Sequence, residues 1–300
     1  MNLVSAELTR KARGRGERRE MQVMDTVTRY WFYPADSESA PSIVFIHGYR
    51  GNHRGLEAIA GALSDFNIYI PDLPGFGEST PFVSAHSIEN YSWWVGEFIH
   101  KLQLPHKPHL LGHSFGSIIV SHHAAHAADF DTLILENPVS APALKGPKAA
   151  LTLLAKLFFD LAPKLPSKTA NWALKSWPMV RGMSIVMTKS HNKKLREWIH
   201  RQHDENFNDF ESNRVAFEGY SASISHHVSE YAARFQRPTL VLIGTKDDIT
   251  SPSQQRQMVA LLKVENRLVE HRAVGHLTHY EIPDLIAEDI REFLQSRNAN

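Results

Sequence analysis

The sequence has no cysteine, no long apolar run and almost no net charge, and each absence narrows what the chain can be. Without cysteine there is neither a disulfide framework nor a cysteine nucleophile. No stretch approaches the roughly 20 apolar residues that span a bilayer, and no apolar leader opens the chain. A net charge of +1 gives no reason to expect a nucleic-acid or membrane partner. We therefore expect a cytoplasmic globular protein, a monomer or homodimer.

The most informative motif is Gly-His-Ser-Phe-Gly at 112–116. It lies between apolar residues 109–111, typical of a strand, and a helix-compatible stretch at 117–128. A serine on a sharp strand-to-helix turn has an exposed hydroxyl, and small neighbours let the strained backbone pass. The backbone N–H of Phe115 then lies at a helix N-terminus, where it can donate to an oxyanion. Ser114 is therefore the candidate nucleophile.

Candidate partners for this serine follow in the second half of the chain. An apolar strand at 239–243 leads into a loop with Asp247, the candidate orienting carboxylate. A further strand at 267–273 is followed by His276, the candidate base. A serine hydroxyl needs such a base within hydrogen-bond reach, and the acid holds the imidazole in the useful tautomer. The order serine, acid, histidine, each just past a strand, is typical of α/β-hydrolases. No cofactor is needed for this chemistry.

Three further motifs strengthen that similarity. His-Gly-Tyr-Arg at 47–50 resembles the H-G-x loop of the α/β-hydrolase fold family, 71–79 resembles its D-x-P-G-x-G-x-S turn, and 275–283 resembles its closing histidine loop. The chain thus resembles a cap-bearing serine hydrolase of that family, over about 40–137 and 235–296. The resemblance implies that the backbone N–H of Tyr49 is the second oxyanion donor. It also implies an esterase- or lipase-like activity through an acyl-enzyme.

Each catalytic assignment has a rival in the sequence. Asp248, adjacent to Asp247, could be the acid instead. Asp247 lies three positions after Gly244, the spacing usual in the family, and Asp248 fits better as the cap of the next turn. Glu136 ends a predicted strand, at a position where some relatives carry the acid. His279 could replace His276, yet it lacks a preceding glycine and is expected to line or pack the loop.

The chain contains 18 histidines, so a metal site must be weighed. His122, His123 and His126 lie on the predicted helix after the serine, two of them one turn apart. A zinc protease requires H-E-x-x-H or a nearby acidic ligand, and the sequence around them offers neither. We predict no metal.

Alternating strands and helices predict a mostly parallel, eight-stranded sheet covered by helices on both faces. Residues 1–139 and 233–300 form this core, opened by strands at 21–24 and 27–33. The basic run at 11–20 is expected to be a solvated extension. Residues 140–232 break the alternation after the sixth strand, where the family inserts a helical cap. Helices are expected there at 148–161, 167–177, 180–188, 193–207 and 213–223.

The expected cap is rich in large apolar side chains, which favours a pocket for a small apolar ester. Trp172, Trp177 and Met183 are the candidate substrate contacts. Carbon–carbon bond hydrolysis is the alternative reaction, with Arg181 or Arg196 binding a substrate carboxylate. A non-catalytic ligand-binding module of the same fold is the alternative class of function.

Overall fold

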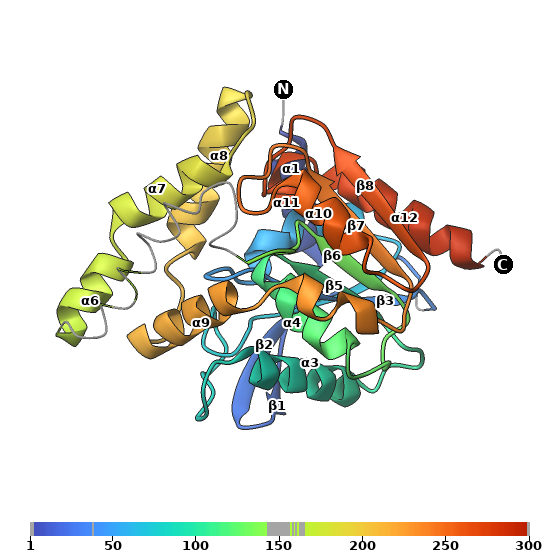
Figure 1. Ribbon diagram of the computed structural model, residues 1–300, viewed down its shortest axis with the longest axis horizontal. Helices are drawn as coiled ribbons and strands as arrows, with labels where there is room; N and C mark the ends of the chain where they lie inside the picture. Colours follow the sequence, from blue (N-terminus) through green and yellow to red (C-terminus); the bar gives the residue numbers. More distant parts are fainter. Residues whose placement is uncertain are drawn as a thin grey trace.

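A single eight-stranded sheet organises the structure, a computed structural model that describes residues 3–37, 39–142, 157, 159, 161 and 166–298 (Figure 1). The strand order is β1-β2-β4-β3-β5-β6-β7-β8. The β1–β2 and β2–β4 pairs are antiparallel, and every pair from β4–β3 to β7–β8 is parallel. The predicted α/β-hydrolase sheet is thereby confirmed. The strands are β1 Glu17–Val23, β2 Thr26–Tyr33, β3 Ser42–Ile46, β4 Asn67–Pro71, β5 His109–His113, β6 Leu133–Glu136, β7 Thr239–Gly244 and β8 Asn266–His271.

Helices cover both faces of this sheet, which explains why its central strands are apolar on both sides. Along β3, Val44 and Ile46 pack into the core under α3 and α4, whereas Ile43 and Phe45 pack into the core under α1, α2 and α12. The helices of the two layers are α1 Val4–Arg15, α2 Glu57–Ala62, α3 Ile88–Leu102, α4 Phe115–Ala124, α10 Pro252–Val259, α11 Thr278–Glu281 and α12 Pro283–Asn298, with the 3₁₀ turn η1 His53–Leu56.

The prediction that the basic run at 11–20 is a solvated extension is wrong, because these residues lie in helix α1 and strand β1. Helix α1 packs on α2, and β1 begins at Glu17, four residues before the predicted strand. Burial of Ala12 and an ion pair of 2.7 Å between Arg13 and the buried Glu57 hold α1 in place. A Cβ at Gly61 would overlap the backbone of α1, so glycine permits this close helix contact. Basic side chains here bind the neighbouring helix and do not solvate a free tail.

Four helices lie between β6 and β7 in chain order and beside one end of the sheet, at the left of Figure 1. They are α6 Ser167–Leu174, α7 Trp177–Met187, α8 Lys193–Asn206 and α9 Asn213–Ser225, followed by the 3₁₀ turns η4 Val228–Glu230 and η5 Ala232–Arg234. These match four of the five helices expected there within a few residues. The fifth, at 148–161, lies almost entirely outside the described residues. Among the described helices, none is both long and apolar enough to cross a membrane.

Candidate active site

Ser114 occupies the sharp turn between β5 and α4. Its φ of 51° and ψ of −117° place it in a strained conformation that non-glycine residues rarely adopt. Both flanking glycines are required by close packing. A Cβ at Gly116 would overlap the carbonyl oxygen of Ile46 in β3, and one at Gly112 would lie 2.7 Å from the carbonyl oxygen of Gly116. The turn therefore projects the serine hydroxyl beyond the carboxyl end of the sheet.

The three predicted triad side chains meet in one hydrogen-bonded chain. Ser114 Oγ lies 2.8 Å from His276 Nε2, and His276 Nδ1 lies 2.8 Å from Asp247 Oδ2. The other oxygen of Asp247 accepts the backbone N–H of Ile249 at 2.8 Å. The side-chain NH₂ of Asn137 donates to Asp247 Oδ2 at 3.1 Å. These bonds fix the carboxylate, which in turn orients the imidazole toward the serine.

Burial and charge act in opposite directions on His276. Burial lowers its pKa, but the Asp247 carboxylate and its hydrogen bond outweigh that effect, and the net pKa lies above the ordinary value of 6.5. Both side chains are buried, so their interaction is little screened by solvent. The arrangement makes His276 a stronger base than a histidine in water, as proton removal from a hydroxyl requires.

The loop after β3 places the backbone of Tyr49 beside the serine. His47 anchors this loop, because its Nε2 accepts the N–H of Leu73 at 2.9 Å and its Nδ1 donates to the carbonyl of Gly48 at 2.9 Å. A Cβ at Gly48 would lie 3.3 Å from Ser114 Cβ, so the loop passes very close to the nucleophile. Tyr49, Phe115 and Ser114 line the same cavity. The loop that carries Tyr49, the second expected oxyanion donor, is therefore adjacent to the nucleophile.

The next residue, Arg50, carries a structural role that sequence reasoning missed. Its side chain is only 1% exposed and has no carboxylate partner in the described part of the chain. The guanidinium donates to the carbonyls of Leu174 and Phe207, each at 2.9 Å, and to Asn208 Oδ1 at 2.8 Å. These carbonyls end α6 and follow α8, where the helix dipole is negative. Arg50 thus ties the Tyr49 loop to the helices between β6 and β7.

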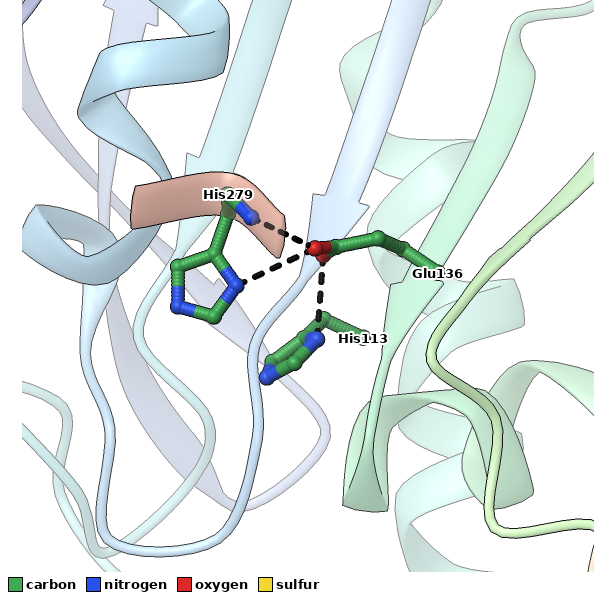
Figure 2. Close-up of side chains that lie close together, drawn as sticks. All are labelled: His113, Glu136 and His279. Atoms are coloured by element: carbon green, nitrogen blue, oxygen red, sulfur yellow. Dashed lines mark hydrogen bonds and ion pairs between the residues drawn. The ribbon is translucent and has the colours of Figure 1, made fainter. Parts of the chain in front are cut away.

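Two of the rival residues, Glu136 and His279, form a buried cluster with His113 (Figure 2). Glu136 lies 3.0 Å from His113 Nδ1 and 3.1 Å from His279 Nδ1, and it also accepts the backbone N–H of His279 at 2.9 Å. Burial raises the pKa of Glu136, but the two histidines outweigh it and bring the pKa well below its usual value. Burial lowers the pKa of His113 to about 4. Glu136 is therefore a buried carboxylate that holds the histidine loop, while Asp247 contacts His276.

This cluster is also the set of described residues that offers three possible metal-ligand atoms, all within 4.8 Å of one another. Its carboxylate already accepts the backbone N–H of His279 and contacts both imidazoles, so Glu136 has partners within the structure. The histidines of α4 have partners of their own. His122 contacts Ser92 at 2.8 Å, and His123 contacts Asp129 at 2.7 Å.

Asp248 lies in the cavity wall and pairs with Lys189 at 2.5 Å. The backbone N–H groups of Ile249 and Thr250 bind Asp247, at 2.8 and 3.4 Å. Asp247 therefore caps the turn that follows it with one carboxylate oxygen and binds the imidazole of His276 with the other.

A cavity of about 680 Å³ opens over Ser114 and His276. Its wall is mostly apolar. Helices α7, α8 and α9 contribute to it together with loops of the sheet core, and its apolar members include Val139, Phe159, Pro178, Met179, Met183, Val186, Met187, Phe207, Tyr220, Ile224, Ile249, Leu277 and Tyr280.

One of the three predicted substrate contacts lines the cavity and two do not. Met183 lines the cavity, but Trp172 and Trp177 lie outside it and are 73% and 62% exposed. Their predicted role is therefore corrected. The helical phase of α7 turns its methionine side toward the cavity and Trp177 away, and Trp172 lies on α6, which contributes no residue to the cavity wall. Arg181 pairs with Asp204, and Arg196 donates to backbone carbonyls, so neither cation faces the cavity.

Comparison with known proteins places this geometry among hydrolases. A family model described as alpha/beta hydrolase fold matches residues 41–283. The chain is 24% identical to Lipase 1 of Psychrobacter immobilis over 253 residues, covering 84% of this chain and 76% of that protein. It is 22% identical to Lipase 3 of Moraxella sp. strain TA144 over 272 residues, covering 86% and 78%.

Solved structures show the same fold. A putative lipase from Acinetobacter baumannii superposes with a TM-score of 0.75 at 18% identity, covering 100% of this chain and 98% of that one. An esterase from Exiguobacterium antarcticum gives a TM-score of 0.74 at 16% identity, covering 92% and 98%.

Proposed function

Since the chain belongs to the alpha/beta hydrolase fold family and is a carboxylic ester hydrolase, we propose that it cleaves a small apolar ester through an acyl-enzyme on Ser114. The observation that carries this proposal is the hydrogen-bonded chain from Ser114 Oγ through His276 to Asp247, with 2.8 Å at both links. Its nucleophile also faces the apolar cavity directly.

In the acylation step, Ser114 Oγ attacks the ester carbonyl carbon as its proton passes to His276 Nε2. Asp247 stabilises the imidazolium that forms. The carbonyl oxygen becomes negatively charged and accepts hydrogen bonds from the N–H groups of Tyr49 and Phe115. Each donor of this kind is worth about 3 kcal/mol of barrier. The tetrahedral intermediate collapses when the alkoxide leaves and takes the proton from His276.

Deacylation repeats the chemistry with water. His276 removes a proton from the water molecule, the hydroxyl attacks the acyl carbon, and the same two N–H groups bind the second oxyanion. The acid product leaves when Ser114 recovers its proton from the imidazolium. Apart from water and the ester, every reacting group in these steps belongs to the chain.

We further propose that residues 140–232 form a cap that shapes the substrate pocket and excludes water. Helix α7 supplies Met183 and Val186 to the wall above the nucleophile. Methionine side chains are flexible and polarisable, which suits an apolar group of variable shape. The absence of Arg181 and Arg196 from this wall removes the carboxylate-binding cation that carbon–carbon hydrolysis was expected to use.

The proposal is tested by Ser114→Ala. We expect kcat on p-nitrophenyl butyrate to fall about 10⁶-fold, as for nucleophile removal in other serine hydrolases. A fluorophosphonate should label the wild type at Ser114 and leave the variant unlabelled. Ser253→Ala, a change at an exposed serine, is the matched control and should retain full turnover. Ester turnover by folded Ser114→Ala at the wild-type rate would refute the proposal.

A further inference from the structure

Helix α7 is apolar on two opposite sides, and the cavity uses only one of them. Met183 and Val186 line the cavity. Trp177 and Ile185 lie on the other side of the helix and are 62% and 58% exposed. Trp172, near the end of the preceding helix α6, is 73% exposed. Side chains of this size are usually buried, so three so exposed on two consecutive helices make this a candidate docking surface.

The same stretch carries a strong positive charge. Residues 166–201 contain eight lysines and arginines and one glutamate, a net charge of +7 in a chain whose total is +1. Between 166 and 192 there is no acidic residue at all. Lys168 is exposed one helical turn before Trp172, and it makes no ion pair with any residue in the described part of the chain. This segment is therefore much more cationic than the chain as a whole, although Arg181 and Lys189 have carboxylate partners in the structure.

Arg181, one of these cations, contacts the exposed Trp177 directly. Its guanidinium lies 5.3 Å from the ring centre of Trp177, while it pairs with Asp204 of α8. Figure 1 shows α6 and α7 along the left edge of the molecule, on the far side from β8 and α12. No other described segment of the sheet layers lies outside them in that view.

We propose that the face of α6 and α7 bearing Trp172, Trp177 and Ile185 docks on a bilayer of anionic phospholipids. Tryptophan rings favour the boundary between acyl chains and headgroups, and lysines near an anionic surface add electrostatic attraction. An amphipathic, cationic helix lies in that boundary with its apolar side buried. An acidic soluble protein would satisfy the charge but gives no reason for the exposed indoles.

Docking in this orientation places the cavity close to the lipid. The wall residues Met183 and Val186 and the docking residue Trp177 belong to one helix, so about 10 Å, the diameter of a helix, separates the bilayer from the cavity. Apolar esters partition into bilayers and would reach Ser114 by this short path. That part of the inference rests on the proposed function, whereas docking itself does not.

The test is co-sedimentation of the full chain with vesicles of phosphatidylcholine alone, and of equal parts phosphatidylcholine and phosphatidylglycerol. We expect binding to the mixed vesicles and much weaker binding to the neutral ones. Trp172→Ala with Trp177→Ala should lower the partition constant at least tenfold, since each indole buries a large apolar surface. Lys168→Gln should lower it about fivefold.

Two matched variants control for loss of any tryptophan or lysine. Trp93→Ala removes a tryptophan that is 62% exposed on α3, and Lys263→Gln removes an exposed lysine far along the chain from the cap helices. Both should bind mixed vesicles as the wild type does. Thermal melting of each variant checks that the fold is kept.

Several results would overturn the inference. These are no binding to mixed vesicles, equal binding to both vesicle types, or unchanged binding by the double tryptophan variant. Binding to soluble polyglutamate without vesicle binding would instead assign the face to an acidic protein. Failure of docking and of the proposed chemistry are separable, because Ser114→Ala should still bind vesicles, and the double tryptophan variant should still hydrolyse a soluble short-chain ester.

Discussion

Replacing Asp247 by asparagine removes a negative charge and leaves the shape of the side chain intact. One carboxylate oxygen accepts the N–H of Ile249 at 2.8 Å, so the amide oxygen of the asparagine should occupy that side. Its NH₂ group then faces His276 Nδ1 and the side-chain NH₂ of Asn137. An NH₂ group cannot accept the Nδ1 proton. His276 should therefore turn to the tautomer with its proton on Nε2.

In that tautomer the imidazole cannot accept the proton of Ser114. Both links of the triad measure 2.8 Å, so the whole orienting effect of the carboxylate is available to be lost. The same exchange in a serine protease lowers kcat about 10⁴-fold. At 1.36 kcal/mol for each factor of ten, this is a loss of about 5.4 kcal/mol of transition-state stabilisation. We expect a loss of that order here.

The measurement is kcat/KM on p-nitrophenyl butyrate, with thermal melting to verify the fold. Asp248→Asn is the matched comparison, because Asp248 is adjacent and pairs with Lys189 at 2.5 Å. It should retain activity within about tenfold, a change on the scale of a surface or rim charge. If Asp247→Asn keeps more than a tenth of the wild-type activity, or if Asp248→Asn is the more damaging change, Asp247 is not the orienting acid.

Three further predictions follow from contacts around the triad. Because only neutral imidazole can accept a proton and the pKa of His276 is raised, kcat/KM should fall as pH drops, with a midpoint above 6.5; a midpoint below 6 would contradict this. Arg50→Met takes the donor from one buried and two partly buried acceptors, so urea unfolding should show a loss of about 3 kcal/mol in the free energy of unfolding, whereas no loss would exclude the anchoring role. Gly116→Ala should lower stability by about 1–3 kcal/mol and reduce activity, because its Cβ overlaps the Ile46 carbonyl; an unchanged melting temperature would disprove this close packing.

The architecture and the triad were accessible from residue order because both depend on local patterns. Strand and helix periodicity predicted the parallel sheet, and parallel strands bring their carboxyl ends to one edge. Ser114, Asp247 and His276 each follow such a strand, so their meeting was implied by topology before any distance was known. The glycines on either side of Ser114 likewise predicted a strained turn from a local pattern, and the positive φ of Ser114 agrees with it.

The long-range choices among similar side chains needed tertiary structure. Glu136 ends β6 and Asp247 follows β7, and only the packing shows that Glu136 binds His113 and His279 while Asp247 binds His276. The buried guanidinium of Arg50 reaches carbonyls that lie 124 and 157 positions away, a relation that no periodicity records.

The helices between β6 and β7 show most clearly which properties the sequence predicts and which depend on tertiary packing. Their apolar content and positions could be read from the chain, because composition and helical propensity are local properties. The rotation of α7 against the core decides which side of this helix faces the cavity: it turns Met183 toward the cavity and exposes Trp177. Large apolar side chains lie on both sides of α7, so hydrophobicity alone could not show which side faces the cavity. Local sequence patterns determined the catalytic residues, whereas tertiary packing determined the orientation of this helix.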